Sequence, residues 1–314
     1  MSTLFLSHDS SLDHDTGPGH PERADRIRAI ERVLEHERFA SLLRRAAPRG
    51  ARAAIERVHP AGYVAAVERA SPANGHVHVD QDTIMSAGTF EAIMHSVGGA
   101  AAAVDAVMSG EVDNAFVAAR PPGHHANRTT PMGFCFFNNV AIAARQAQVV
   151  HGAERIAIVD FDVHHGNGTQ SIFWSDPSVL YCSTHQMPLF PGTGGRDERG
   201  DCDNIVNAPL SEGADGQVFE DAMRSVILPR VDAFRPDLIL ISAGFDAHHL
   251  DPLGGLALNE TDFAWITGKL RDLAERHCQG RIVSLLEGGY SLEGLTRSVV
   301  AHLLTLMGRD RDPS

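Results

Sequence analysis

The stretch Ile156-Ala157-Ile158-Val159-Asp160-Phe161-Asp162-Val163-His164-His165-Gly166 decides the fold that we expect for this chain. Its first four residues are apolar and mostly β-branched, which is typical of a parallel strand buried on both faces. Carboxylates and imidazoles follow this strand, and in open α/β sheets ligands bind beyond the carboxyl ends of the strands. Asp162 and His164 are two residues apart, so in extended backbone their side chains point the same way. They are therefore candidate ligands of one metal ion, although a solvated polar loop would have the same composition.

Strand and helix patterns alternate along the rest of the chain. Strands are predicted over residues 3–7, 114–119, 155–160, 179–183, 237–242 and 281–286. Helical spacing predicts helices over residues 20–39 (with Pro21 early in the helix), 86–108, 139–150, 215–234, 261–277 and 292–306. Long loops are expected over residues 7–20, 120–137, 184–204 and 244–259. The alternation predicts one α/β domain over residues 1–314, with three α/β/α layers and a mostly parallel central sheet.

Composition limits the class of protein. The 314 residues are 43% hydrophobic and 21% charged, and the net charge of −13 argues against a nucleic-acid partner. Four cysteines without CxxC spacing predict free thiols in a reducing compartment: Cys135, Cys182, Cys202 and Cys278. The chain shows neither a signal peptide nor an apolar run of about 18 residues, so we expect a cytoplasmic protein without a membrane partner.

Other predicted strands also end in chemically useful side chains. His124 and His125 follow the second strand, and paired imidazoles suit acid–base work near neutral pH. Asp246 is a candidate third metal ligand, or a helix cap. Tyr290 is a candidate hydrogen-bond donor to an oxyanion, or a core tyrosine. Two aspartates and one histidine would leave one coordination position of a metal ion open for water. A water activated in this way indicates hydrolysis, for example of an amide.

The motifs together resemble the histone deacetylase superfamily, which includes acetylpolyamine amidohydrolases and bacterial histone deacetylase-like amidohydrolases. In the family's order these are HPER (20–23), RPPGHH (120–125), GFCFFNN (133–139), DFDVHHGNG (160–168), PGTGG (191–195), SAGFDAH (242–248) and EGGY (287–290). The resemblance covers nearly the whole chain. It implies the arginase/deacetylase-like α/β fold and a deacetylase that removes acetyl or other acyl groups from an amine.

The resemblance also implies a metal centre. Asp162, His164 and Asp246 look like the ligands of one catalytic Zn(2+) ion, and Tyr290 matches the tyrosine that polarises the acyl carbonyl. Whether zinc or ferrous iron is loaded in a cell stays open, because both accept this donor set.

The same carry-over assigns partners to the histidine pair. His125 resembles the general base, and His124 an electrostatic or acid partner. Asp160 matches the buried carboxylate that orients His124. Asn167 falls where the partner of His125 belongs, and asparagine there resembles class II members, since class I members usually carry aspartate.

The substrate and potassium sites are implied in the same way. Phe134 and Phe190 match the aromatic walls of the substrate tunnel, Gly133 the glycine whose carbonyl meets the substrate amide, and Leu253 the gatekeeper at the tunnel mouth. Structural potassium is implied at two sites, the first formed by Asp160, Asp162, His164, Ser183 and Thr184 and the second by Phe173, Asp176 and Val179.

Several functions stay open. Leu253 favours acyl-lysine in a protein or peptide over acetylpolyamines. The carboxylate of Asp13 or Asp15 would, however, attract the second amine of a polyamine. A two-metal ureohydrolase is disfavoured, because Gly166 and His248 stand where its extra carboxylates belong. A non-catalytic metal-containing binding module and a homo-oligomer are further alternatives.

Overall fold

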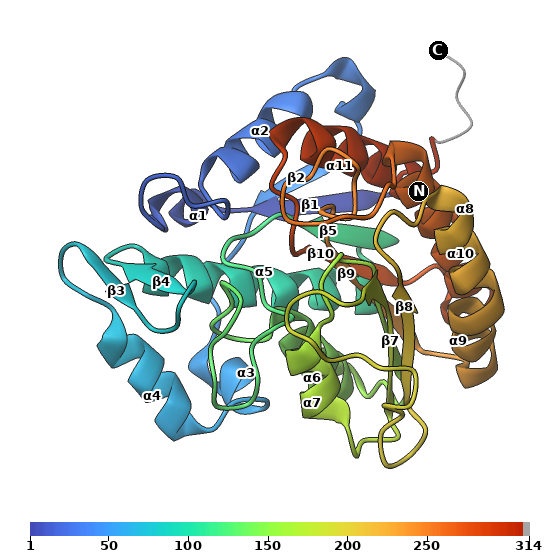
Figure 1. Cartoon of the computed structure of the whole chain (residues 1–314), viewed down its shortest axis with the longest axis horizontal. Coiled ribbons are helices and arrows are strands. Elements are labelled where there is room, and N and C mark those ends of the chain that lie inside the picture. Colours follow the sequence, from blue (N-terminus) through green and yellow to red (C-terminus); the bar gives the residue numbers. More distant parts are fainter. Residues whose placement is uncertain (310–314) are drawn as a thin grey trace.

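The computed structural model describes residues 1–309, and its centre is an eight-stranded sheet (Figure 1). The strand order is β2-β1-β5-β10-β9-β6-β7-β8, and every neighbouring pair is parallel. The strands are β1 (Thr3–Ser7), β2 (Leu43–Ala46), β5 (Asn114–Val117), β6 (Ile156–Asp160), β7 (Val179–Gln186), β8 (Ile205–Leu210), β9 (Leu238–Ala243) and β10 (Ile282–Leu286). A short antiparallel pair, β3 (His76–His78) and β4 (Ile84–Ser86), lies apart from this sheet.

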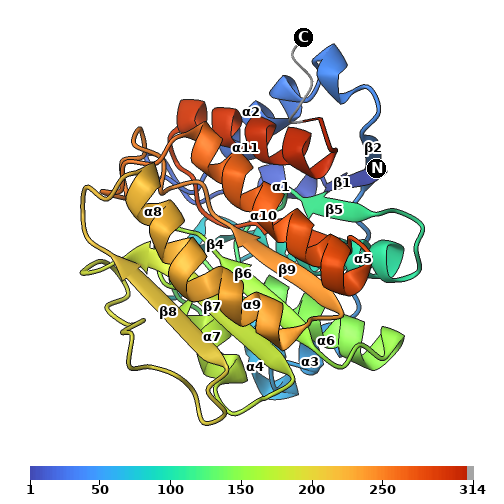
Figure 2. The ribbon, with the colours of Figure 1, turned by 90° about the vertical axis from the view of Figure 1, so that its right-hand side faces the viewer.

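Helices cover both faces of the sheet (Figure 2). One face carries α2 (Asp25–Val33), α8 (Gly216–Ala222), the π-helical turn η2 (Met223–Ile227), α9 (Leu228–Phe234), α10 (Glu260–Cys278) and α11 (Leu292–Leu306). The other carries α3 (Arg52–Glu56), α4 (Ala61–Ala70), α5 (Thr89–Met108), α6 (Asn139–His151) and α7 (Asn167–Phe173). The short helices α1 (Ser10–Asp13) and η1 (Glu37–Phe39) belong to the first 40 residues of the chain. The expected three-layer α/β/α fold with a parallel sheet is therefore confirmed.

Every strand of the central sheet except β2, whose residues are exposed, supplies side chains to two separate hydrophobic cores. In β1, Leu4 and Leu6 belong to the core beneath α3–α6, whereas Phe5 belongs to the core beneath α2 and α8–α11. Successive side chains of a strand point to opposite faces, so a strand covered on both sides must be apolar throughout. This is why the central strands read as unbroken apolar runs.

The structure corrects the predicted helix over residues 20–39. The helix begins only at Asp25 and ends at Val33, and Pro21 lies before it. Residues 20–24 cannot be helical because the buried Glu22 is held by tertiary contacts, including a hydrogen bond from the Thr16 hydroxyl to its carbonyl at 2.6 Å.

Other boundaries also differ from the predictions. The helix predicted from residue 86 starts at Thr89, because Ile84–Ser86 is strand β4 and the Ser86 N–H donates to the Thr89 hydroxyl at 2.8 Å. The helix over residues 215–234 is interrupted by the π-helical turn η2. The predictions do not include strands β2, β3, β4 and β8 or helices α1, α3, α4 and α7. The residues of β2 are all exposed, so β2 has no apolar signature. Within residues 1–309, no helix combines the length and apolar character that a membrane crossing requires.

Candidate active site

The site lies beyond the carboxyl ends of four adjacent strands, in the order β5-β10-β9-β6. Asp162 and His164 follow β6 and Asp246 follows β9, so neighbouring parallel strands bring the three donors to one edge of the sheet. His164 Nδ1 is 3.1 Å from Asp162 Oδ1 and 3.1 Å from Asp246 Oδ2. Among residues 1–309, this is the one group of three or more His, Cys, Asp or Glu side chains whose ligand atoms come within 4.8 Å of one another.

The backbone around the two carboxylates is shaped by glycine. The Gly288 N–H donates to Asp162 Oδ2 at 2.8 Å. A Cβ at Gly244 would lie 2.0 Å from Asp162 Oδ2, and one at Gly288 would lie 2.0 Å from Asp246 Oδ2. The glycines after β9 and β10 are therefore required by close approach of the backbone to the donor oxygens.

The electrostatics of this group fit a divalent cation. Burial and the negative charge of Asp162 raise the pKa of Asp246 to about 7. Burial disfavours protonation of His164, but hydrogen bonds and charges from Asp162 and Asp246 outweigh it and raise its pKa to about 10. Two buried carboxylates with a single imidazole between them need a compensating positive charge. Two carboxylate oxygens and one imidazole nitrogen are donors that zinc accepts, and they would leave one coordination position of the ion open.

Each histidine of the pair after β5 has its own partner. His124 Nδ1 is 3.0 Å from Asp160 Oδ2, and His125 Nδ1 is 2.8 Å from Asn167 Oδ1. The two ring centroids are 4.0 Å apart. The Tyr181 hydroxyl donates to the same oxygen, Asp160 Oδ2, at 3.1 Å and so helps to fix that carboxylate.

The two histidines differ in charge because their partners differ. Burial disfavours the charged form of His124, but the carboxylates of Asp160, Asp162 and Glu287 raise its pKa well above 6.5. Burial lowers the pKa of His125 well below 6.5, and the positive charges of its histidine neighbours lower it further. His125 is therefore neutral with Nε2 free to accept a proton, because Nδ1–H donates to the Asn167 amide oxygen.

Aromatic rings flank the metal-binding group. The Phe134 ring meets the Tyr290 ring edge-on at 5.8 Å, and the Phe190 ring meets the His125 ring edge-on at 5.1 Å. Phe190 is 40% exposed, so part of this ring faces solvent. Gly133 has φ +54°, and a Cβ there would lie 2.5 Å from the His125 ring. The two rings thus approach the site from its tyrosine side and its histidine side.

Tyr290 lies in the loop after β10 and is held there by Asp251 of the loop after β9 and by Arg26 of α2. Its N–H and that of Ser291 donate to Asp251 Oδ2 at 2.6 and 3.0 Å. The Arg26 guanidinium lies 4.9 Å from the Tyr290 ring centroid, and its Nε donates to the Gly289 carbonyl at 2.7 Å. Burial raises the pKa of Tyr290 well above 10, although Arg26 opposes this, so the phenol keeps its proton and can donate.

Glu287 is a buried residue of the site that the sequence patterns did not assign. Its Oε2 accepts the N–H groups of Gly123 at 2.7 Å and His124 at 3.1 Å, and its Oε1 accepts the Ser242 hydroxyl at 3.2 Å. It therefore ties the loop after β5 and the carboxyl end of β9 to the loop after β10. Its position directly after a buried strand, like that of Asp160 at the end of β6, was a signal that could have identified it.

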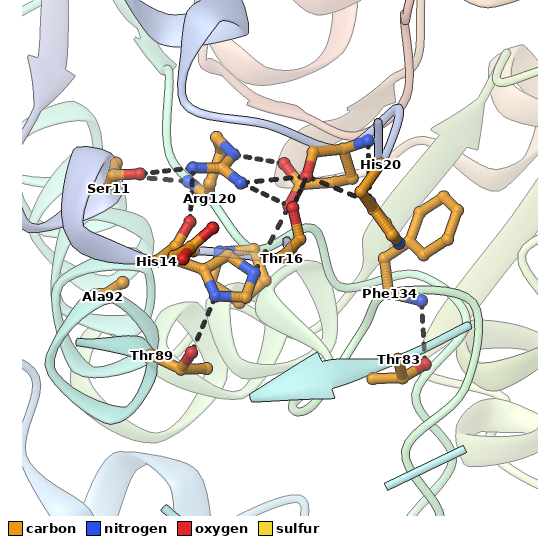
Figure 3. A network of polar contacts seen from close by, with 12 residues as sticks. Ser11, His14, Thr16, His20, Thr83, Thr89, Ala92, Arg120 and Phe134 are labelled. Carbon is orange, nitrogen blue, oxygen red and sulfur yellow. Dashed lines mark hydrogen bonds and ion pairs between the residues drawn. The ribbon is translucent and has the colours of Figure 1, made fainter. Parts of the chain in front are cut away.

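A second unassigned group holds the N-terminal segment against the site, as Figure 3 shows around Arg120. Arg120 donates to the carbonyls of Ser11 and His14 at 2.5 and 3.1 Å and to Glu22 Oε2 at 2.8 Å. All of these groups lie in the interior, where a carboxylate must be paired. The HPER and RPPGHH motifs contain Glu22 and Arg120, but nothing in their spacing indicates that they meet.

The same segment extends to the substrate side of the site. The His20 ring meets the Phe134 ring edge-on at 4.8 Å, and the Phe134 N–H donates to the Thr83 hydroxyl at 3.1 Å (Figure 3). Phe134 is therefore held between the N-terminal segment and the residues just before β4.

The remaining residues singled out in the sequence occupy the following places. Leu253 is partly buried, and its N–H donates to Asp251 Oδ1 at 3.0 Å. Asp15 pairs with His76 of β3 at 2.9 Å. A Cβ at Gly166 would lie 2.3 Å from Asp160 Oδ2, so a second metal-binding carboxylate has no room there, and His248 faces Glu260 at 3.4 Å.

The two sets carried over for potassium differ. In the first set, Asp160 and Ser183 are register partners across β6 and β7, and the buried Thr184 hydroxyl oxygen has no hydrogen-bond partner, which leaves it free for a cation. In the second set, the carbonyl oxygens of residues 173, 176 and 179 converge on the side-chain nitrogen of Asn204. In this second set, a protein group therefore lies at the point where the three carbonyls converge.

Comparisons with known proteins agree with this geometry. Residues 20–306 match the family model described as histone deacetylase domain. The chain is 41% identical over 299 residues to a probable deacetylase of Archaeoglobus fulgidus, covering 94% of this chain and 83% of that protein. It is 45% identical over 215 residues to a histone deacetylase-like amidohydrolase of Pseudomonas aeruginosa, covering 67% of this chain and 57% of the relative. The crystal structure of the HDA15 HD domain superposes with a TM-score of 0.93 at 37% identity, covering 98% of this chain and 89% of the other.

Proposed function

The chain belongs to the histone deacetylase family, and from this premise we propose that it is a zinc-dependent amidohydrolase that removes acetyl or other acyl groups from acyl-lysine or a related acylated amine. The observation that carries the proposal is the buried group of Asp162, His164 and Asp246 beside two histidines. Each histidine has a different partner, and such differences separate acid from base roles.

The side chains divide the chemistry between them. A bound divalent ion would polarise the acyl carbonyl and acidify the attacking water. His125 is neutral and accepts the proton of that water, while Asn167 keeps its ring in the required tautomer. His124, which carries a positive charge beside Asp160, would protonate the leaving amine. Tyr290 donates a hydrogen bond to the developing oxyanion.

The walls of the site favour a slim aliphatic amine. Phe134 and Phe190 offer apolar ring surface to the methylenes of a lysine side chain, whose burial contributes about 25 cal/mol per Å². Leu253 offers no charge to a second amine. We therefore propose acyl-lysine as the leading substrate and acetylpolyamines as the second candidate. The second rests on Asp15, whose side chain is 66% exposed on the segment that leads to His20.

The test is a hydrolysis assay that compares an acetyl-lysine peptide with N-acetylated polyamines. We expect turnover of the peptide, its loss in the presence of a chelator, and its return after zinc is added. Turnover of the polyamines alone would select the second candidate. Absence of chelator-sensitive turnover on both substrates, in protein that carries zinc, would contradict the proposed activity and favour a metal-containing binding module.

A further inference from the structure

Three backbone carbonyl groups converge on one side-chain nitrogen away from the catalytic group. Asn204 Nδ2 is 2.8 Å from the carbonyl oxygen of Phe173, 3.0 Å from that of Asp176 and 3.0 Å from that of Val179. Phe173 ends α7, Val179 begins β7, and Asn204 directly precedes β8. One amide group therefore joins three elements at the amino ends of two strands.

Convergent carbonyl oxygens repel one another unless a positive centre lies between them. A side-chain amide carries only two N–H groups, so three oxygens within 3.0 Å exceed what it can satisfy with full hydrogen bonds. The arrangement is therefore that of a cation site with an amide nitrogen at its centre. An alkali ion in contact with the same three oxygens would coincide with Nδ2.

The orientation of the Asn204 amide follows from its surroundings. The side chain is 4% exposed, and its Oδ1 is buried without a hydrogen-bond partner. Rotating the amide by half a turn would place Oδ1 against three carbonyl oxygens, which is worse than leaving it unpaired. The backbone is fixed as well, because the Asn204 carbonyl accepts the Tyr181 N–H at 2.9 Å.

An ion pair and a ring contact hold two of the three carbonyl-bearing residues in place. Arg145 of α6 is 2.7 Å from Asp176 Oδ2, and its guanidinium lies 4.9 Å from the Phe173 ring centroid. The Arg145–Asp176 ion pair is only about one-quarter exposed. Because the charge of Arg145 is balanced by Asp176, the donor that faces the convergent carbonyl oxygens is the Asn204 amide.

We propose that the Asn204 amide replaces the second potassium ion in this chain, so that the carbonyls of Phe173, Asp176 and Val179 bind no alkali cation. The junction of α7, β7 and β8 is then held by a covalently attached donor, and its stability does not depend on the salt in solution. The inference does not depend on the proposed reaction, since the amide lies outside the metal group and the histidine pair.

A crystal of the wild-type protein grown or soaked in thallium(I), a potassium substitute with strong anomalous scattering, tests the proposal directly. We expect no anomalous peak among the three carbonyl oxygens in the wild type. We expect a peak there in Asn204→Ala, where the amide is removed and the carbonyls remain. A wild-type peak at this position would overturn the proposal, as would its absence from well-ordered Asn204→Ala crystals.

Thermal unfolding in KCl and in choline chloride of equal ionic strength gives a second readout. Asn204→Ala should melt several degrees lower in choline chloride and recover part of this loss as KCl is added, beyond any response of the wild type. The matched control is Asn207→Ala. Asn207 lies in β8, three residues after Asn204, and is also buried, but its Nδ2 donates mainly to Gln170 Oε1 at 2.7 Å. This control should show no added potassium response. An equal response of the wild type and both variants would contradict the proposal.

Discussion

At the scale of single residues, the site depends on differences between neighbours of the same type. His124 and His125 are adjacent and buried, yet a carboxylate partner raises the pKa of the first, whereas burial lowers the pKa of the second, whose partner is an amide. The site also requires particular glycines: Gly244 and Gly288 are needed because the backbone there approaches the metal-binding carboxylates closely. A substitution that removes or exchanges one functional group of a side chain in the site should therefore change the chemistry without changing the fold.

Tyr290→Phe tests the oxyanion role at this scale. The variant loses one hydroxyl and keeps the ring against Phe134, so the fold and the metal group should be unchanged. We expect kcat to fall roughly 10²- to 10³-fold, the usual cost of one oxyanion donor. Steady-state kinetics with the acetyl-lysine peptide measure this, and metal content should remain one equivalent. Near-normal turnover would remove Tyr290 from the mechanism.

Asp246→Ala tests the metal-binding group. The variant leaves one carboxylate and one imidazole, so we expect metal content well below one equivalent and loss of the chelator-sensitive activity. Elemental analysis of the purified protein measures the content, with Tyr290→Phe as the control that keeps all three donors. A full equivalent of zinc in Asp246→Ala would contradict its assignment as a ligand.

At the scale of elements, four adjacent parallel strands deliver the metal-binding group, the histidine pair and Tyr290 to one edge of the sheet, and buried carboxylates then fix the loops to one another. Glu287, in the loop after β10, binds the loop after β5 through two backbone N–H groups and the carboxyl end of β9 through a hydroxyl. Asp251 does the same for two loops, since it accepts the N–H groups of Tyr290 and Ser291 through one oxygen and that of Leu253 through the other. Loop geometry, and with it the position of the phenol, therefore depends on residues that do not touch the reacting atoms.

Asp251→Asn tests this positioning role. An amide keeps one acceptor oxygen and turns a donor toward the backbone N–H groups, so Tyr290 should shift and kcat should fall by roughly 10- to 100-fold. In a Tyr290→Phe background the same change should have little further effect on kcat, because the phenol is already absent. Asp262→Asn serves as a control, since Asp262 also accepts a backbone N–H, from Asn259 at 2.8 Å, but at the start of α10. Fully additive effects of the Asp251 and Tyr290 changes would contradict the coupling.

At the scale of the whole molecule, two hydrophobic cores enclose histidines that must stay neutral. His302 on α11 lies between the hydroxyls of Thr267 and Ser284 at 2.6 and 2.9 Å, and burial lowers its pKa to about 3. The unfolded chain binds a proton at this position near pH 6.5, whereas the folded chain does not. Its contribution to stability is therefore complete above pH 6.5 and is lost progressively as the pH falls toward 3.

His302→Gln should make the acid loss of stability shallower. Below about pH 5.5 the free energy of unfolding of the wild type should fall by up to about 1.4 kcal/mol per pH unit from this group alone, with a smaller slope near pH 6.5. The variant cannot titrate there, so it should be less stable at pH 7.5 but lose less on acidification. Denaturant unfolding at several pH values measures both effects. The exposed His78 provides the control His78→Gln, which should follow the wild type; a parallel decline in His302→Gln would contradict the assignment.

The sequence by itself determined the parallel three-layer fold and the candidate chemistry, because both are written in local patterns. Apolar runs such as Ile156–Asp160 specify doubly covered strands, and the polar residues that follow them must meet at one sheet edge. Only the tertiary structure decided which distant groups meet: Glu22 with Arg120, Asp251 with Tyr290, and Asn204 with three carbonyls. These contacts join loops far apart in the chain, and no periodicity along the sequence specifies the geometry that brings loops together.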